Sequence, residues 1–205
     1  MQSFRLPRVY PLTDVELSGL SHADQVRLLS LGGATLVQLR EKQMPALRFY
    51  EQARAAVALG VPLIINDRLD IALAVGAHGV HLGQDDMPPA AARRLLGDKA
   101  VIGYSTHSVE QAKKALTLPI DYIAIGPIFA TSSKTNPSPT LGLEGLRAVR
   151  EAVGNTQLVA VGGISHSNAR EVIEAGADSI AVISALFADP AQISHATQTL
   201  INSLL

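Results

Sequence analysis

The pattern of residues 63–87 restricts the fold more than any other part of this chain. One apolar run, 63–65, ends at Asp67, and a second apolar run, 80–82, ends at Asp86, with a short amphipathic segment between them. This is the pattern of a strand, a helix and a second strand. Two buried parallel strands that are joined by a helix end side by side. We therefore expect Asp67 and Asp86 to project into one cleft.

Two carboxylates in one cleft predict a metal site. They repel each other unless a cation lies between them, and Mg²⁺ is commonly held by one or two carboxylates together with substrate phosphate oxygens. Asp67 and Asp86 are accordingly our predicted magnesium ligands. The alternative is that both are ordinary turn residues, since Asn, Asp and Gly dominate turns. The pairing of two strand ends, where sites in α/β proteins are built, favours the metal.

The alternation of apolar runs and helical segments continues through the rest of the chain. Strands are predicted at residues 9–13, 35–39, 63–65, 80–82, 101–105, 122–125, 158–161 and 180–183, and helices at 21–31, 45–59, 88–96, 108–116, 143–153, 168–175 and 190–205, besides the amphipathic segment described above. Eight strands alternating with eight helices predict an α/β fold, a single (β/α)₈ TIM barrel domain over residues 1–205 with its active site at the C-terminal ends of the strands. A doubly wound open sheet is the alternative, but no Gly-x-Gly-x-x-Gly motif follows the first strand.

Composition excludes several classes of protein. The hydrophobic fraction is 47% while aromatic residues make up only 4%, so the core must be mostly Ala, Leu, Ile and Val, which suits buried parallel strands. A net charge of −1 without a basic stripe argues against nucleic acid as a partner, and no apolar run is long enough for a membrane span. Zero cysteines exclude disulfides and cysteine-ligated metals. With no signal-peptide pattern at the start, we expect a soluble cytoplasmic protein, and a homo-oligomer is left open.

The predicted strand ends carry the residues that could do chemistry, because the active site of such a barrel lies there. Gln38, Arg40 and Lys42 alternate by two, which aims all three to one side of an extended segment. A polar loop at residues 130–141 is long for this chain, which suggests a functional flap. The other strand ends and this loop add Asn66, Gln84, Ser105, His107, Thr131, Ser133, Lys134, Gly162, Gly163, Ile183 and Ser184.

Two anion-binding regions are predicted among these residues. Gly162 and Gly163 allow close backbone approach, and amide N–H groups at a following helix start attract phosphate, although a plain tight turn is an equal alternative. Arg40, Lys42 and Lys134 add cations beside the two aspartates, with the alternative that Lys134 is merely solvated. The combination suggests two phosphorylated substrates, or one phosphate ester and a pyrophosphate leaving group.

Other catalytic arrangements are weak in this sequence. Ser105 lacks the second glycine of a nucleophile elbow, so we predict a hydrogen-bond donor and not a nucleophile. No His-Glu-x-x-His pattern surrounds His81, which is predicted to be a structural histidine with its hydrogen bonds satisfied, facing the barrel wall or core. His166 and His195 are predicted to be exposed. His107, just beyond a strand end, is left as the histidine that could act as an acid or base.

With these residues assembled, the chain resembles the thiamine monophosphate synthase family of (β/α)₈ barrels over residues 9–187. The landmarks in order are QLREK at 38–42, IINDRLDIALAVGAHGVHLGQDD at 64–86, IGYSTHS at 102–108 and DYIAIGPIFATSSK at 121–134, followed by GLEGL, VAVGGI and IAVISALF. Each piece alone is weak evidence, whereas seven in the same order are highly specific.

The resemblance implies a transferase of thiamine biosynthesis. Such an enzyme couples hydroxymethylpyrimidine pyrophosphate to hydroxyethylthiazole phosphate, or to its carboxylated form, and releases pyrophosphate by a dissociative, Mg²⁺-assisted mechanism. The resemblance implies catalytic roles for Lys42, Ser105 and Lys134, magnesium ligands at Asp67 and Asp86, pyrophosphate contacts from Arg40, Lys42, Asn66 and Lys134, a pyrimidine contact from Gln38, and a thiazole phosphate site at Thr131, Ser133, Gly163, Ile183 and Ser184.

One departure from the family pattern and two rival functions accompany this resemblance. The usual Thr-x-Thr-Lys reads Thr131-Ser132-Ser133-Lys134 here, and Ser133 keeps the hydroxyl, so we expect function to be retained. A related thiazole tautomerase, an isomerase on the same barrel, would use His107 but would need no metal site. A non-catalytic sensor of phosphorylated ligands would bind without turnover, and no attached interaction segment supports it.

Overall fold

Eight parallel strands form one sheet in the computed structural model, which describes residues 4–131 and 139–205. The strands are β1 (Val9–Pro11), β2 (Val37–Leu39), β3 (Leu63–Asn66), β4 (Gly79–Leu82), β5 (Val101–Thr106), β6 (Tyr122–Ile125), β7 (Leu158–Val161) and β8 (Ser179–Val182). Their order in the sheet is β1-β8-β7-β6-β5-β4-β3-β2, so each strand lies beside its neighbours in sequence.

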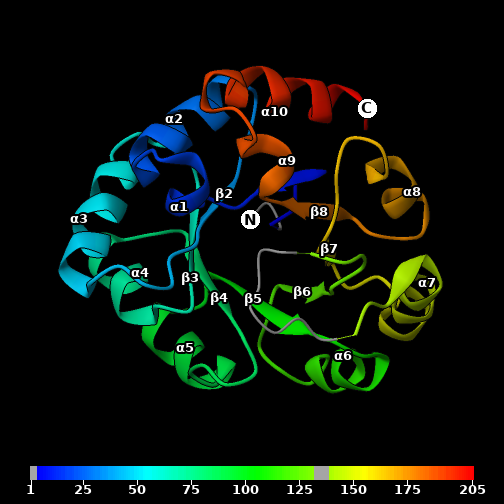
Figure 1. Cartoon of the computed structure of the whole chain (residues 1–205). Helices are drawn as coiled ribbons and strands as arrows, with labels where there is room; N and C mark the ends of the chain where they lie inside the picture. Colours follow the sequence, from blue (N-terminus) through cyan, green and yellow to red (C-terminus); the bar gives the residue numbers. More distant parts are fainter. Residues whose placement is uncertain (1–3, 132–138) are drawn as a thin grey trace.

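The sheet closes on itself between β1 and β2. Just beyond β1, Leu12 forms a parallel bridge with Gln38 of β2, and the amide of Thr13 donates a hydrogen bond of 2.9 Å to the carbonyl oxygen of Gln38. Figure 1 shows the resulting ring of strands inside a ring of helices. The predicted (β/α)₈ barrel is confirmed, and the doubly wound open sheet is excluded.

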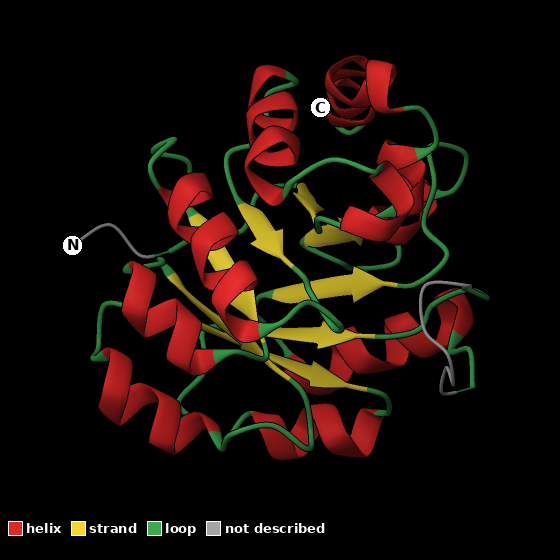
Figure 2. Ribbon diagram, turned by 60° about the vertical axis from the view of Figure 1, so that its left-hand side comes forward, coloured by secondary structure: helices red, strands yellow, loops and turns green. Residues whose placement is uncertain are grey.

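Helices cover the outer face of the barrel, as Figure 2 shows from a second direction. Ser21 and Ser108 cap the helices that follow them, since each accepts a hydrogen bond from an amide in the first turn. The helices are α1 (Val15–Ser18), α2 (His22–Leu31), α3 (Ala46–Val57), α4 (Leu69–Val75), α5 (Pro89–Leu96), α6 (Val109–Ala115), α7 (Gly142–Val153), α8 (Ala169–Glu174), α9 (Ser184–Phe187) and α10 (Ile193–Asn202), and a 3₁₀ turn, η1 (Pro190–Gln192), precedes α10.

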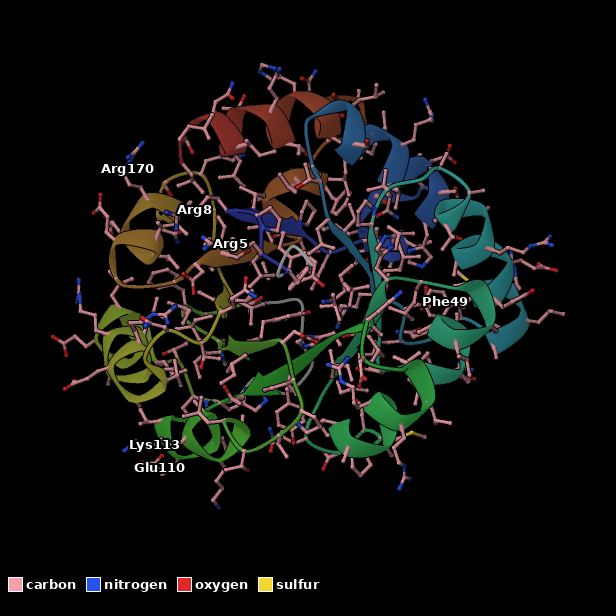
Figure 3. The ribbon with its side chains drawn as sticks, turned by 180° about the vertical axis from the view of Figure 1, so that it is seen from behind. Arg5, Arg8, Phe49, Glu110, Lys113 and Arg170 are labelled. Carbon is pink, nitrogen blue, oxygen red and sulfur yellow. The ribbon has the colours of Figure 1, made fainter. Side chains whose placement is uncertain are left out.

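The apolar core has two layers because successive strand residues point to opposite faces of the sheet. Leu63 and Ile65 of β3 belong to the layer between strands and helices, whereas Ile64 points into the barrel interior. Phe49 on α3 packs in the outer layer, and Figure 3 shows it directed toward the strands, while Arg170 lies at the rim of the molecule. Burial on both faces explains why the strands read as nearly continuous apolar runs.

Most predicted strands and helices differ from the structure by one or two residues at an end, and three differences bear on the rest of the fold. The helices α1 and α9 were not expected, because each has only four residues and cannot show a helical repeat of apolar positions. The predicted closing helix at 190–205 is wrong at both ends, since η1 comes first and α10 ends at Asn202. The last strand ends at Val182, one residue earlier than predicted, and Ile183 precedes α9 as its N-cap.

None of the helices in the described part of the chain is long and apolar enough to cross a membrane.

Candidate active site

A cavity of about 620 Å³ opens at the C-terminal ends of the strands. This volume is typical of a small-molecule site. Two predicted site residues, Ser133 and Lys134, fall outside the described residues, and the others are brought together around the cavity. Those lining it are Gln38, Arg40, Lys42, Asn66, Asp67, Gln84, Asp86, Ser105, His107, Thr131, Gly162, Gly163, Ile183 and Ser184.

Asp67 and Asp86 lie close together on one side of the cavity. The Nζ atom of Lys42 forms an ion pair with Oδ2 of Asp67. Burial raises the pKa of Asp86 and the neighbouring Asp67 carboxylate adds to the rise, while the amide of Gly83, which donates to Asp86 Oδ2 over 2.7 Å, opposes it. The Asp67 carboxylate therefore disfavours a full charge on Asp86, and a divalent cation between the two would relieve the repulsion.

The backbone of Asp67 adopts an unusual conformation that directs its side chain. Its φ is 61°, in the left-handed region, where no other non-glycine residue of the described chain lies. Aspartate tolerates this region better than most residues, and such conformations cluster at functional sites. The Asp67 amide donates to the carbonyl oxygen of His81 over 2.8 Å, which ties the end of β3 to β4. This backbone hydrogen bond helps to hold the ends of β3 and β4 together.

Arg40 also lines the cavity and is held there by residues that follow β1. Its Nη1 atom lies 3.9 Å from Oδ2 of Asp14, and its amide donates to Oγ1 of Thr13 over 3.1 Å. Asp14 and Thr13 were not among the predicted site residues. Their connection to Arg40 depends on the closure between β1 and β2, which no local sequence pattern reveals.

Glu41 organises the turn that carries Lys42. Its Oε1 atom accepts hydrogen bonds from the amides of Lys42, Gln43 and Met44 at 2.8, 2.8 and 3.0 Å. Burial acts to raise the pKa of Glu41, but these three amides and the nearby His22 outweigh it, so that the pKa is lowered. The turn after β2 is therefore fixed by an ionised carboxylate.

His22 lies behind this turn. It is fully buried, its Nδ1 atom is 2.7 Å from Oγ1 of Thr13, and its Nε2 atom is 3.6 Å from Oε2 of Glu41. Burial lowers the pKa of His22 despite the raising influence of Glu41. The neutral ring thus contacts Thr13, after β1, and Glu41, after β2, without contributing a charge to the cavity.

The opposite side of the cavity contains two glycines at the end of β7. Gly162 and Gly163 have φ values of 103° and 63°, which a side chain would strain. A Cβ atom on Gly163 would lie 2.5 Å from the carbonyl oxygen of Ala130, and one on Gly162 would lie 2.6 Å from Cβ of Pro127. The end of β7 therefore packs directly against the segment after β6, and only glycine permits that approach.

A hydrogen-bonded series of five side chains, which we call the floor chain, crosses the barrel and lines the inner end of the cavity. It links Gln38 Nε2 to Tyr10 OH (3.0 Å), Tyr10 OH to Tyr122 OH (3.1 Å), Tyr122 OH to His81 Nδ1 (2.9 Å), and His81 Nε2 to Ser105 Oγ (2.8 Å). His81 is buried and hydrogen-bonded, as predicted for a structural histidine, but it also contacts a predicted site residue. Both tyrosines were missed.

The missed tyrosines had a detectable signal. Tyr10 and Tyr122 are polar-tipped residues inside apolar strands, and a buried phenol needs a hydrogen-bond partner. What the sequence does not show is the identity of that partner, because Tyr10 and Tyr122 are 112 residues apart.

Two histidines were predicted to be exposed, and a third, His107, was left as a possible acid or base. His166 and His195 are exposed. His107 lies at the cavity, with Nδ1 2.6 Å from the carbonyl oxygen of Gly126 and its amide donating to Oε1 of Gln111 over 2.7 Å. A ring held at Nδ1 by a carbonyl keeps Nε2 as the nitrogen available for proton transfer.

The architecture first defines a class: a (β/α)₈ barrel enzyme whose strand ends bring carboxylates, cations and glycine turns to one cavity. A sequence model of the family described as thiamine monophosphate synthase matches residues 9–186. The chain belongs to this family, and the predicted resemblance is confirmed.

Individual relatives agree with the family assignment. A thiamine-phosphate synthase from Albidiferax ferrireducens is 49% identical over 204 residues, covering 96% of this chain and 93% of the relative. One from Chloroflexus aurantiacus is 49% identical over 186 residues, covering 88% and 85%. The solved structure of a thiamine phosphate pyrophosphorylase from Pyrococcus furiosus superposes with a TM-score of 0.85 at 37% identity, covering 96% and 95%. The prediction of an enzyme of this type is confirmed.

A more distant structure shares the fold alone. A phosphoribosyl anthranilate isomerase from Thermotoga maritima superposes with a TM-score of 0.70 at 17% identity. The barrel is therefore common to different activities, and function has to be argued from the residues at its mouth.

Proposed function

We propose that this chain couples hydroxymethylpyrimidine pyrophosphate to hydroxyethylthiazole phosphate, or to its carboxylated form, giving thiamine phosphate and pyrophosphate. The observation that carries the proposal is the convergence of Asp67, Asp86 and Lys42 at one side of the cavity in a member of this family. A leaving pyrophosphate is the ligand that needs both a cation clamp and carboxylates for a metal.

The donor set at the two aspartates suits Mg²⁺. In the described parts of the chain no group of three or more histidine, cysteine or acidic side chains could hold a metal ion by itself. Two carboxylates are enough for Mg²⁺, which usually takes its other oxygens from substrate phosphates and water. The raised pKa of Asp86 beside Asp67 supports the same reading, because a cation would stabilise both carboxylates in the charged form. When bound, Mg²⁺ would neutralise charge on the pyrophosphate as it departs.

The protein side chains around the leaving group would bind and orient it. Lys42 and Arg40 supply positive charge, as Lys134 would from the loop after β6, and Asn66 at the end of β3 lines the cavity next to Asp67. The Ser105 hydroxyl, at the end of β5, would hydrogen-bond the bridging region. Loss of pyrophosphate leaves a carbocation that the pyrimidine ring stabilises, so the chemistry demands charge neutralisation more than proton transfer.

The thiazole phosphate would bind at the other side of the barrel mouth. Gly163, Ile183 and Ser184 line the cavity at the ends of β7 and β8, where barrels of this kind often hold a phosphate. Thr131 lines the cavity from the loop after β6, and Ser133 would act beside it. In a ring of eight strands in this order, β3 faces β7 and β4 faces β8. The thiazole nitrogen would thus approach from across the cavity. It would attack the methylene carbon on the pyrimidine ring, on the side opposite the departing pyrophosphate.

The tautomerase is the second candidate, and the position of His107 is the observation that favours it. Its ring reaches the cavity and its Nδ1 is engaged by Gly126. A tautomerase would have no use for the paired aspartates or for Lys42, which is why we place it second.

Pyrophosphate release from the two substrates, measured with and without Mg²⁺, tests the proposal. Release that requires both the metal and the thiazole phosphate, with thiamine phosphate as product, is the expected result. Metal-independent isomerisation of a thiazole carboxylate phosphate, without pyrophosphate release, would establish the tautomerase. Ligand binding with no turnover of either kind would leave a sensor and would contradict both enzymes.

A further inference from the structure

We propose that the floor chain assigns the ring proton of His81 to Nε2 and thereby holds the Ser105 hydroxyl as a hydrogen-bond donor to the ligand in the cavity. His81 is then a positioning residue that acts through Ser105. The contacts are those of the floor chain, from Gln38 on β2 to Ser105 on β5. The kinetic part of this inference rests on the proposed function, whereas the proton assignment does not.

The polarity of the chain follows from counting protons. The amide nitrogen of Gln38 can only donate, so the Tyr10 oxygen accepts from it. Among the described residues, Tyr122 is the one acceptor within hydrogen-bond distance of the Tyr10 hydroxyl, so the single Tyr10 proton goes to Tyr122. The Tyr122 proton then goes to Nδ1 of His81. Burial raises the pKa of both tyrosines, so each phenol is neutral and has one proton to give.

The same count continues through the imidazole. A neutral ring that accepts at Nδ1 carries its proton on Nε2, and that N–H donates to the Ser105 oxygen. The hydroxyl proton of Ser105 remains available to a ligand. Ser105 is half-buried and lines the cavity, so this proton can reach a phosphate oxygen there. A phosphate needs donors, and the floor chain supplies one whose direction is already set.

The barrel is built around these rings. The rings of His81 and Tyr122 stack with centroids 5.5 Å apart, and Tyr10 meets Tyr122 edge to face at 6.0 Å. Gly103, on β5, makes room for them: a Cβ atom there would lie 2.1 Å from Cζ of Tyr122 and 2.5 Å from Nδ1 of His81. The buried members of this series are hydrogen-bonded to one another and tightly packed, which favours one arrangement, and positioning requires that.

The proton assignment is tested directly on the wild-type protein by ¹⁵N NMR of the histidine rings at about pH 7.5, where a neutral ring is the ordinary state. The chain has six histidines, so the His81 signals are assigned by their absence from the spectrum of His81→Gln. We expect an Nε2–H tautomer, and a mixture of tautomers in Tyr122→Phe, which removes the donor to Nδ1. An Nδ1–H tautomer in the wild type would show that the chain runs in the reverse direction and would overturn the inference.

A matched pair of variants tests the coupling to Ser105. His81→Gln can place an amide donor near the position of Nε2, whereas His81→Asn, shorter by one methylene, can reach Tyr122 but not Ser105. We expect His81→Asn to lower kcat roughly tenfold, as Ser105→Ala does, and His81→Gln to keep kcat within about threefold of the wild type. Thermal unfolding of both variants, compared with the wild type, checks that they fold.

The double variant separates positioning from packing. If His81 acts through Ser105, His81→Asn combined with Ser105→Ala is no slower than Ser105→Ala alone. Losses that multiply, or equal losses for the Asn and Gln variants, would make His81 a packing residue and contradict the inference. The NMR result can be read even if no pyrophosphate is released, so failure of the proposed function and failure of this inference are distinguishable.

Discussion

The two sides of the barrel mouth differ in the charge of the residues that line them. At the ends of β2, β3 and β4 the cavity is lined by charged side chains, with Lys42 paired to Asp67 and Asp86 beside them. At the ends of β7 and β8 it is lined by uncharged residues, Gly162, Gly163, Ile183 and Ser184, with the two glycines packed against the segment after β6. One side is suited to charge that changes during the reaction, and the other to a phosphate that only has to be held.

This difference decides how each side responds to substitution. At the first side the charges are on side chains, so a substitution that keeps the size of a lining side chain, such as Asp to Asn, tests its charge with little change in shape. At the second side the backbone of the two glycines makes part of the surface, so a substitution there changes the shape of the binding region and the stability together. The predictions below test whether the two sides are as distinct as their construction indicates.

Neutralising either aspartate should have the largest effect. In Asp67→Asn and Asp86→Asn we expect Mg²⁺-dependent pyrophosphate release to fall by about 100-fold or more, because a contact to developing charge is lost. Asparagine keeps the size and one acceptor oxygen, so the Gly83 amide can retain its partner. The measurement is kcat together with the Mg²⁺ concentration that gives half the maximal rate, which should rise.

Asp98→Asn is the matched control for these two variants. Asp98 is exposed in the turn between α5 and β5, at the other end of the barrel, so the same change of charge there should leave the rate unaltered. Wild-type activity in both Asp67→Asn and Asp86→Asn would remove the metal site from the proposal.

Adding one methyl group to the backbone side should have the second largest effect. In Gly163→Ala the new Cβ would lie 2.5 Å from the Ala130 oxygen and 2.7 Å from Cβ of Phe129. Relief of this overlap must shift the turn after β7 or the segment after β6. We expect KM for the thiazole phosphate to rise roughly tenfold with an unfolding free energy lower by about 2 kcal/mol, while the Mg²⁺ dependence stays as in the wild type.

Gly154→Ala isolates the contact from the backbone strain. Gly154 has φ 58°, close to the 63° of Gly163, but a Cβ there would have nothing within 4 Å. Its ψ of −123° lies outside the left-handed helical region, so the cost should be about 1–3 kcal/mol, confined to stability, with both KM values unchanged. If Gly163→Ala were to alter the Mg²⁺ response as strongly as the aspartate variants do, the two sides of the mouth could not be independent.

The two sides also differ in how far the sequence alone reveals them. Asp67 and Asp86 could be predicted because each follows its own apolar run, and parallel strands joined by a helix necessarily end at the same edge. The supporting residues could not. Thr13 reaches Arg40 only because the barrel closes between β1 and β2, and Tyr10 meets Tyr122 across the barrel interior. These contacts depend on strand register and closure, which the local patterns do not encode.

The fold shows the same limit on a smaller scale. Apolar runs of three to five residues that recur along the chain predicted all eight strands, whereas the four-residue helices α1 and α9 have no repeat to detect. Glu41 is a sharper case, because it could be read as one charge among several in the segment 38–42. Only the structure shows its Oε1 accepting from three successive amides.

The smallest predicted effect comes from Glu41, which supports the side-chain half of the mouth without lining it. Glu41→Gln keeps an acceptor oxygen but loses the charge, so we expect an unfolding free energy lower by about 1 kcal/mol at pH 7 and a KM for the pyrophosphate substrate a few times higher, since the turn carrying Lys42 loosens. Denaturant unfolding and steady-state kinetics measure the two. Glu51→Gln, at an exposed position of α3, is the matched control and should change neither.

The pH dependence of this difference distinguishes charge from packing. The pKa of Glu41 is lowered from 4.5 by the amides and His22, against the opposing influence of burial, so the unfolded chain takes up the proton more readily. The stabilisation is therefore fully present above about pH 4.5 and is lost as the pH falls through the lowered value. The wild type should approach Glu41→Gln in stability below pH 4.5. A gap that stays constant in acid would mean that shape, and not the carboxylate charge, holds the turn beside Lys42.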